Sequence, residues 1–343
     1  MRRMTRGIIT ALCLGLVAMP WGSAQADDAD VPTQAAKESI TVTIPVRTID
    51  TPGRSGQSGI VEIRVGDSAP LAVMLDTGSV GLRLWGGRPA AAAVTSKPVE
   101  STVDGAQVPG LLGKATMTFG GVSTTMAVPF QLINTDSRYI QQWKSKRVVG
   151  ILGIGVGSGE LTNPLVALPG SLGLRWSVHF ARKLSAQGGA MSALVLGADA
   201  SPDAQMSFPL TYLGLNVNGA LLWDDHAAGG CWTIGTMREQ CVPTWFDSGF
   251  TVMRIKGLQF ARLPQTASHR LRSGTPVALA AGNSAFVGHQ FTAGSTGSRD
   301  LASVLPTRQA TINTGNSFYF DYTVSYDVAQ GVVSLYAPSR KRS

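Results

Sequence analysis

The chain has 343 residues, of which 44% are hydrophobic and only 15% are charged, so the composition excludes an intrinsically disordered protein. The 40 glycines and 18 prolines favour tight turns over the long helices of bundles and coiled coils, and the length fits two domains or one large all-β domain. The 29 Lys and Arg residues outnumber the 21 Asp and Glu residues and give a net charge of +8, which raises the question of nucleic-acid binding.

Residues 1–26 have the pattern of a secretory signal peptide. Three arginines precede an apolar stretch at 7–21, and the small-x-small pattern that a signal peptidase cuts follows at 23–26. Because the apolar stretch is shorter than the ~20 residues that span a bilayer, we expect its removal, with a retained membrane anchor as the alternative. The mature protein is then periplasmic or secreted, has no membrane span, and begins with a flexible leader at 27–38. Loss of the three arginines lowers the net charge from +8 to +5.

Alternating apolar residues predict β-strands along most of the mature chain. At 40–46 every second residue is apolar, and the segments at 60–65 and 71–75 flank a Gly-Asp-Ser turn as in a hairpin. Further strand-and-turn segments lie at 115–133, 192–197 and 322–336, and two short helix candidates lie at 163–168 and 260–271. The predicted fold class is therefore all-β.

One motif occurs twice: an apolar strand that ends in Asp and is followed by a hydroxyl residue and Gly. The first copy ends in Asp76-Thr77-Gly78-Ser79 and the second in Asp247-Ser248-Gly249-Phe250. Similar segments also follow the two copies, Val149–Gly153 after the first and Ile312–Gly315 after the second. From this repetition we infer two related β lobes. The expected boundaries are 39–172 for the first lobe, 173–338 for the second and 339–343 for a basic tail.

The repeated motif is suited to hold two carboxylates. Gly78 and Gly249 allow the backbone to turn tightly and to point N–H groups at the aspartates, which a buried carboxylate requires. The hydroxyls of Thr77 and Ser248 can brace one loop against the other. If the loops meet, the two carboxylates share one proton. Such a pair can deprotonate a water molecule and protonate a carbonyl oxygen, which hydrolyses an amide without metal or cofactor.

At this point the sequence resembles the pepsin-like aspartic proteases, as a divergent member of bacterial type. Besides the two Asp loops, four segments carry the resemblance: Gly110–Val122, Val149–Gly155, Trp176–Asp199 and Gly315–Val333. The resemblance implies a bilobal fold with a cleft between the lobes and an exported endopeptidase with Asp76 and Asp247 as catalytic residues. It also implies a peptide or protein substrate in extended conformation, no cofactor, and a monomer.

The supporting positions implied by the resemblance are only partly retained. Ser79 keeps the hydroxyl beside the first Asp, whereas Phe250 replaces the hydroxyl residue beside the second. Asn313 and Thr314 replace two apolar residues of the family before Gly315.

The flap, which covers the cleft in this family, also departs from the pattern. The flap candidates are Val103, Asp104 and Gly105, and Val103 stands where a tyrosine is expected. Arg83 replaces the tryptophan that pairs with that tyrosine, and Trp85 is a candidate to fill its space. These losses keep open an alternative function, a catalytically silent pepsin-like protein that binds peptides or proteins.

Cys231 and Cys241 are the cysteines that remain after removal of the signal peptide. In an oxidising compartment we expect them to form a disulfide, with two reduced cysteines as the alternative. Two thiols are too few for a structural zinc site, and the four histidines show no metal-ligand spacing, so no metal is predicted.

The basic residues do not form a nucleic-acid site. They lie in short clusters at 144–147, 262–272 and 340–342, without the interleaved aromatic residues on which bases stack. The glycine run at 153–159 does not place a third glycine at the offset that a dinucleotide-binding loop requires, and no convincing helix follows it. The predicted partners therefore include neither a nucleic acid nor a nucleotide.

Overall fold

The computed structural model describes residues 40–337 except 88, 90–91, 104, 160, 182–190, 198–203, 282–286 and 296–299. The predicted signal peptide, leader and basic tail lie outside the described residues. Within the described part, no helix combines the length and the apolar character that a membrane crossing requires.

Most of the strands belong to one sheet of 15 strands, with the order β13-β24-β23-β11-β12-β1-β2-β3-β10-β4-β9-β6-β5 and with β7 and β8 paired beside β2. Its strands are β1 (Val42–Asp50), β2 (Gln57–Val65), β3 (Leu71–Asp76), β4 (Val80–Leu84), β5 (Ala93–Val103), β6 (Ala106–Ala115), β7 (Met117–Phe119), β8 (Val122–Ser123), β9 (Val128–Ile133), β10 (Gly150–Ile154), β11 (Arg175–His179), β12 (Ala193–Leu196), β13 (Met206–Pro209), β23 (Thr323–Asp327) and β24 (Val332–Tyr336).

A second sheet of seven strands has the order β20-β19-β16-β17-β22-β18-β21, and β14 and β15 form a separate hairpin. These strands are β14 (Thr211–Leu215), β15 (Leu221–Asp224), β16 (Ala228–Ile234), β17 (Gln240–Trp245), β18 (Met253–Lys256), β19 (Pro276–Ala281), β20 (Val287–Thr292), β21 (Ala302–Leu305) and β22 (Thr311–Asn313). The helical elements of the described part are the α-helices α1 (Arg138–Lys144) and α2 (Ser317–Asp321) and the 3₁₀ helices η1 (Pro164–Ala167), η2 (Gly170–Gly173) and η3 (Leu258–Phe260).

The two halves of the chain repeat one arrangement of five strands. In the first half, β2, β3, β10, β4 and β9 pair successively in antiparallel, parallel, antiparallel and parallel fashion. In the second half, β16, β17, β22, β18 and β21 pair in the same directions. The segments that follow the two Asp motifs in the sequence form β10 and β22, each the parallel neighbour of the strand that leads to its Asp. The all-β class and the two related lobes are thus confirmed.

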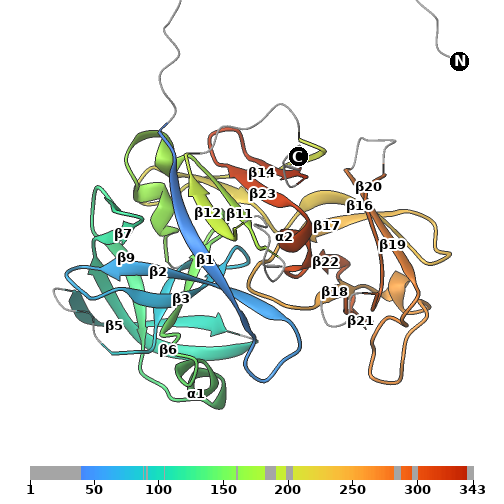
Figure 1. The fold of residues 1–343 in the computed structure, drawn as a ribbon, viewed down its shortest axis with the longest axis horizontal. Helices are drawn as coiled ribbons and strands as arrows, with labels where there is room; N and C mark the ends of the chain where they lie inside the picture. The colour runs from blue at the N-terminus through green and yellow to red at the C-terminus, as the bar shows by residue number, and fades with distance from the viewer. Residues whose placement is uncertain are drawn as a thin grey trace, which may run out of the picture. The chain divides into compact units, whose positions relative to one another are not determined.

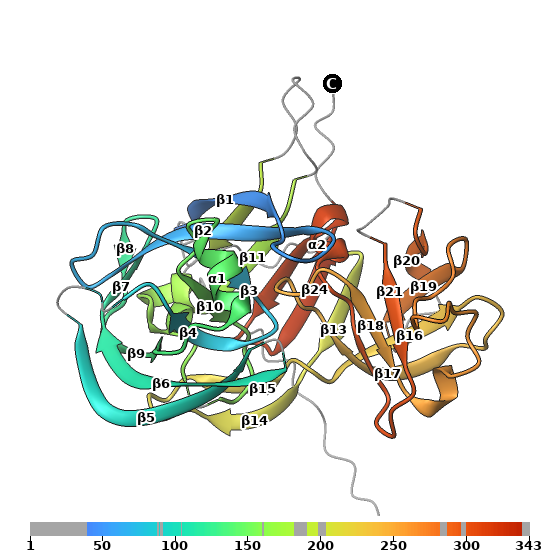
Figure 2. The same ribbon diagram turned by 90° about the horizontal axis from the view of Figure 1, so that it is seen from below.

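Strands from distant parts of the chain join the halves. β1 pairs with both β2 and β12, and β11 pairs with both β12 and β23, so the end of the chain returns to strands near its beginning. In Figure 1 the strands β16–β22 lie to one side and β2–β9 to the other, with β11 and β23 between them, and Figure 2 shows β16–β21 and β2–β9 on opposite sides as well.

The predicted local elements are largely present. The segments 60–65 and 71–75 form the antiparallel pair β2 and β3, and the helix candidate at 163–168 is the short η1, which Asn163 caps. The helix predicted at 260–271 is wrong. Pro264 lacks the N–H that a helix would use, and the chain forms turns that end in an isolated bridge between Gln265 and Leu271.

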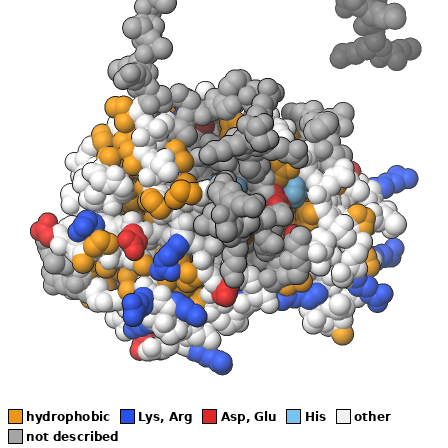
Figure 3. Space-filling model, in the orientation of Figure 1, with side chains coloured by type: hydrophobic (Ala, Val, Ile, Leu, Met, Phe, Trp, Pro, Cys, Tyr) orange, Lys and Arg blue, Asp and Glu red, His pale blue; other side chains and the backbone are white. Residues whose placement is uncertain are grey.

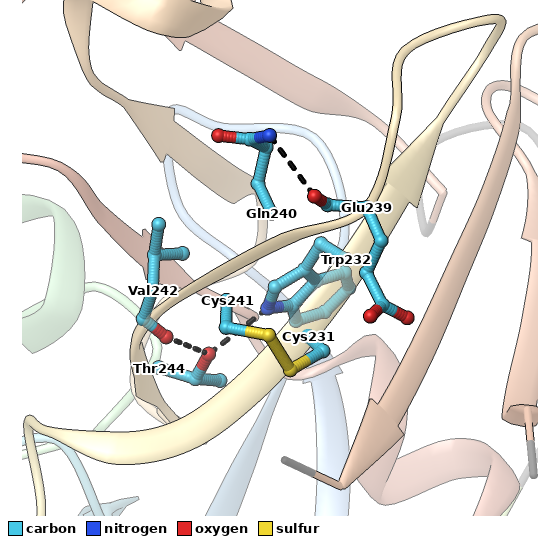
Figure 4. The surroundings of a disulfide bond; sticks show 7 residues. All are labelled: Cys231, Trp232, Glu239, Gln240, Cys241, Val242 and Thr244. Atoms are coloured by element: carbon cyan, nitrogen blue, oxygen red, sulfur yellow. Dashed lines mark hydrogen bonds between the residues drawn. A yellow bond between two sulfur atoms is a disulfide. The ribbon is translucent and has the colours of Figure 1, made fainter. Parts of the chain in front are cut away.

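Cys231 and Cys241 form a disulfide that joins β16 to β17, where the two residues are directly opposite each other (Figure 4). Beside it, the Trp232 indole N–H donates to the Thr244 hydroxyl at 2.9 Å. Glu239 lies near both sulfur atoms, but the disulfide leaves no thiolate for a metal in this group. The bond therefore fastens the strand β17, which leads directly to Asp247.

Candidate active site

The strands β3 and β17 bring Asp76 and Asp247 to the same place. Each aspartate is followed by a short loop, and each carboxylate lies against the glycine of the opposite loop. A Cβ atom on Gly78 would collide with the Asp247 carboxylate, and one on Gly249 would collide with that of Asp76. The absence of a side chain at these glycines is thus what lets the two carboxylates approach.

Four reciprocal hydrogen bonds hold the two loops together. The Thr77 hydroxyl donates to the Phe246 carbonyl at 2.8 Å and accepts from the Ser248 N–H at 2.9 Å. The Ser248 hydroxyl donates to the Leu75 carbonyl at 3.1 Å and accepts from the Thr77 N–H at 2.9 Å. Because Thr77 and Ser248 are almost completely buried, these bonds fix the separation of the aspartates without competition from water.

Two buried tyrosines extend this brace into the second half of the chain. The Tyr319 hydroxyl lies 2.7 Å from the Thr77 hydroxyl and 2.8 Å from that of Tyr326, and Tyr326 donates to the Phe246 carbonyl at 3.0 Å. Burial raises the pKa of both tyrosines, so both remain protonated donors. Sequence reasoning gave neither a role, because hydrogen bonds between residues so far apart leave no local pattern.

Each carboxylate also has two donors of its own. Asp76 accepts from the Gly78 N–H at 2.8 Å and from the Ser79 hydroxyl at 2.6 Å. Asp247 accepts from the Gly249 N–H at 2.9 Å and from the Asn313 side-chain amide at 2.6 Å.

Asn313 is thus the counterpart of Ser79. The sequence places Phe250, which cannot donate, at the position equivalent to Ser79, and the structure supplies the donor from β22 instead. The carbonyl oxygen of the Asn313 side chain accepts from the Gly315 N–H at 2.8 Å, which directs the amide nitrogen toward Asp247. In the sequence, this replacement could have been found only by considering two positions together: residue 250 lacks the expected hydroxyl, and residue 313 has an amide.

The two aspartates lie in different electrostatic surroundings. Burial raises the pKa of Asp247 to about 7, the nearby charge of Asp76 adds to this increase, and the Asn313 and Gly249 donors oppose it. Proton sharing is expected where two carboxylates are so close. Below neutral pH the proton of the pair therefore resides on Asp247.

The aspartates face a cavity of about 600 Å³. Val103 and Gly105, at the tip of the β5–β6 hairpin, line it, whereas the flap candidate Asp104 lies outside the described residues. Tyr139 and Trp143 of α1 also line it, and the sequence reasoning missed both. Trp85 is not among the lining residues. Its indole N–H instead donates to the Val148 carbonyl at 2.9 Å, within a hydrophobic cluster that also contains Val103.

The cavity wall also carries basic residues that the sequence analysis did not assign to a site. Arg54, Arg83 and Arg254 all line it, and the guanidinium carbons of Arg54 and Arg254 lie 5.2 and 3.8 Å from the centre of the Phe250 ring. Outside the cavity, Lys and Arg side chains are dispersed over the face shown in Figure 3 and form no single stripe.

Acidic residues lie elsewhere on the cavity wall. Asp224, Asp225 and His226 line it, and His226 stacks on Trp245 with ring centroids 3.8 Å apart. Burial raises the pKa of Asp225, while His226 and the N–H groups around it lower it. The cavity is therefore basic in one part and partly acidic in another.

Comparison with known proteins agrees with this architecture. The crystal structure of the aspartic proteinase from the fungus Irpex lacteus is similar to this chain, with a TM-score of 0.59 and 17% sequence identity over 89% of this chain and 99% of the proteinase. No protein-family model matches the chain, and no curated protein sequence matches it. The similarity establishes that the chain has the pepsin-like fold.

Proposed function

We propose that this protein is an aspartic endopeptidase, a divergent member of the pepsin-like family, in which Asp76 and Asp247 activate a water molecule. The observation that carries the proposal is the placement of two carboxylates on reciprocally braced loops, each with its own pair of donors. Assignment to a bacterial type within the family stays a prediction.

In this mechanism the two aspartates have unequal roles. Burial and the nearby Asp76 raise the pKa of Asp247 to about 7, so we assign the shared proton to Asp247 and the activation of water to Asp76. Asp76 takes a proton from water as the water oxygen attacks the peptide carbonyl carbon, and Asp247 gives its proton to the carbonyl oxygen. The tetrahedral diol then collapses as its C–N bond breaks: a proton moves from Asp76 to the leaving nitrogen, and one diol hydroxyl returns its proton to Asp247 as the new carbonyl forms, which restores the pair.

The expected substrate is a peptide or protein segment in extended conformation. The cavity lies under the tip of a β-hairpin, whose backbone can pair with an extended chain in β fashion. The hairpin β5–β6 would cover this segment, with Val103 and Gly105 at its tip. We further propose export to the periplasm or the medium and action as a monomer. The signal-peptide pattern supports export, and a disulfide is compatible with an oxidising compartment.

The proposal is tested by digestion of an unstructured protein between about pH 3 and 7, with wild type and Asp76→Asn in parallel. We expect fragments from the wild type, none from the variant, and inhibition by pepstatin. Circular dichroism and thermal melting of both proteins control for folding. A folded wild type that cleaves nothing and does not bind pepstatin would refute the proposed endopeptidase activity.

A catalytically silent peptide-binding protein is the second candidate. The observation that favours it is the flap tip, where Val103 offers no hydroxyl to a substrate above the aspartates. Such a protein would bind unstructured peptides with unchanged affinity after Asp76→Asn, and the same digestion would give no fragments.

A further inference from the structure

Arg83 occupies an unusual place for a charged side chain. Met74, Ile151 and Arg83 are directly paired across the adjacent strands β3, β10 and β4, so their side chains leave the same face of the sheet. Met74 and Ile151 belong to the buried hydrophobic cluster that packs under α1. Arg83 thus places a cation at the end of an apolar row, and all three residues line the cavity.

The guanidinium of Arg83 is held beside the catalytic pair by neutral groups. Its Nη1 donates to the Ser79 hydroxyl and to the Gly81 carbonyl, both at 3.3 Å. The same Ser79 hydroxyl donates to Asp76 at 2.6 Å. The arginine therefore lies next to the position where a scissile bond would be.

The charge of Arg83 has little compensation within the protein. Among the described residues, no ion pair joins it to an Asp or a Glu, and its buried Nε has no hydrogen-bond partner. Burial lowers the pKa of Arg83, and only the field of nearby Asp76 opposes this. Arg83 is partly buried, and because its guanidinium has no ionic partner in the described part of the chain while its Nε is buried without an acceptor, this side chain is prepared for an anion that enters the cavity.

Other charges line the same cavity. Arg54 and Arg254 lie against the Phe250 ring beside the second Asp loop, and Asp224 and Asp225 are acidic residues of the wall. Arg83 is the cation that contacts the first Asp loop, through Ser79 and Gly81. A glutamate fits the site well, because its two methylene groups would contact Met74 and Ile151 while its carboxylate pairs with Arg83.

We propose that Arg83 makes this protein selective for an acidic side chain, glutamate or aspartate, next to the bond that it cleaves. The inference rests on the proposed function and names its substrate class. Arg83 acts here as a specificity-determining residue, and its effect is a preference between substrates.

The test uses two sets of three fluorogenic peptides. Within a set the peptides differ at one residue, Glu, Gln or Leu, which lies on one side of the scissile bond in the first set and on the other side in the second. At about pH 6, where a glutamate side chain is ionised, wild type should prefer Glu over Gln by about tenfold or more in kcat/KM, as expected for a charge-assisted pair. In Arg83→Met the ratio should fall to about one, with Leu favoured. Arg254→Met, a cation of the same cavity, is the matched control and should keep most of the preference.

Because a ratio within one variant is compared, a general loss of activity does not obscure the result. Equal cleavage of the three peptides by wild type in both sets, or an unchanged Glu preference in Arg83→Met, would overturn the inference and leave the endopeptidase intact.

A binding assay separates the inference from the proposed function. Uncleavable analogues with a reduced peptide bond are titrated into wild type and Arg83→Met, and affinity is followed by fluorescence anisotropy. One outcome would be that no peptide is cleaved, while the Glu analogue binds wild type about tenfold more tightly than the Gln analogue and Arg83→Met abolishes this difference. That outcome would refute the proposed endopeptidase and support the selectivity for an acidic side chain. Equal affinities for the two analogues would refute it.

Discussion

At the scale of single residues, the side-chain donor to Asp247 comes from position 313 and not from position 250. Phe250 removes a hydroxyl donor, and Asn313 supplies an amide donor to the same carboxylate at 2.6 Å. Because Asn313 also opposes the rise in the pKa of Asp247, it affects both the orientation and the proton affinity of that group. For the proposed reaction, Asn313 would therefore be a positioning residue.

We predict that Asn313→Leu lowers kcat by about tenfold or more, since a hydrogen bond to a charged group contributes about 1.5–3 kcal/mol. The donors oppose the pKa rise, so the alkaline limb of the pH profile should also move to higher pH. Addition of Phe250→Thr to this variant restores a hydroxyl and should recover part of the rate. Steady-state kinetics of the two single variants and the double variant test this. Equal rates for Asn313→Leu and wild type, with an unmoved pH profile, would contradict the assigned role.

The sequence predicted some of these site residues better than others. Asp76, Asp247 and the residues around them form contiguous motifs, so the local chain already contains each carboxylate with its glycine and hydroxyl neighbours. Asn313, Tyr319 and Arg83 contact those motifs from other elements, β22, α2 and β4 respectively. Their contributions depend on strand pairing and side-chain direction, which a single sequence does not specify.

At the scale of elements, the loops after β3 and β17 depend on the Thr77 and Ser248 hydroxyls. Each hydroxyl both donates to and accepts from the opposite loop. Removal of one hydroxyl leaves a buried N–H and a buried carbonyl with fewer partners, and the loss of such bonds is costly.

Thr77→Val should therefore reduce the free energy of unfolding by about 2–4 kcal/mol and abolish cleavage, because the loops lose two of their four bonds. Thr77→Ser is the matched control. It keeps the hydroxyl and should therefore retain most of the stability and most of the cleavage activity. Urea unfolding followed by fluorescence measures the difference. Similar stability of the Val and Ser variants would show that the brace contributes little.

The strands themselves follow from local patterns, which explains why the hairpin of β2 and β3 was predictable. The helix expected at 260–271 failed because an apolar spacing of helical type was read across Pro264. The pairing of β1 with β12, and of β11 with β23, joins segments far apart in sequence. The sequence therefore predicted that the two halves are related, but it did not predict the strands that join them in one sheet.

At the scale of the whole molecule, two buried groups make stability depend on pH in opposite directions. The pKa of Asp247 in the folded protein is about 7, above its ordinary value of 3.8. Ionisation of Asp247 therefore lowers the free energy of unfolding as pH rises from about 4 to 7. Burial lowers the pKa of His289 from 6.5 to about 4, so this histidine lowers the free energy of unfolding as pH falls through the same range. The wild-type profile is consequently flattened.

Comparison with Asp247→Asn isolates the contribution of the aspartate. The variant should have a higher Tm than wild type at about pH 7.5, where the ionised Asp247 is buried beside Asp76, and nearly the same Tm at about pH 4. Thermal melting by circular dichroism at both pH values measures this. A variant that is no more stable than wild type at the higher pH would show that Asp247 is not destabilised in the folded protein.

The central claim is that Asp76 and Asp247 act as one unit that holds a single proton. Its most direct test is the pH dependence of kcat/KM for cleavage of one peptide by the wild-type protein. We predict a bell-shaped profile that declines above about pH 7, because the proton on Asp247 is then lost. Cleavage that continues to increase above that pH, or an absence of cleavage at every pH, would contradict the claim.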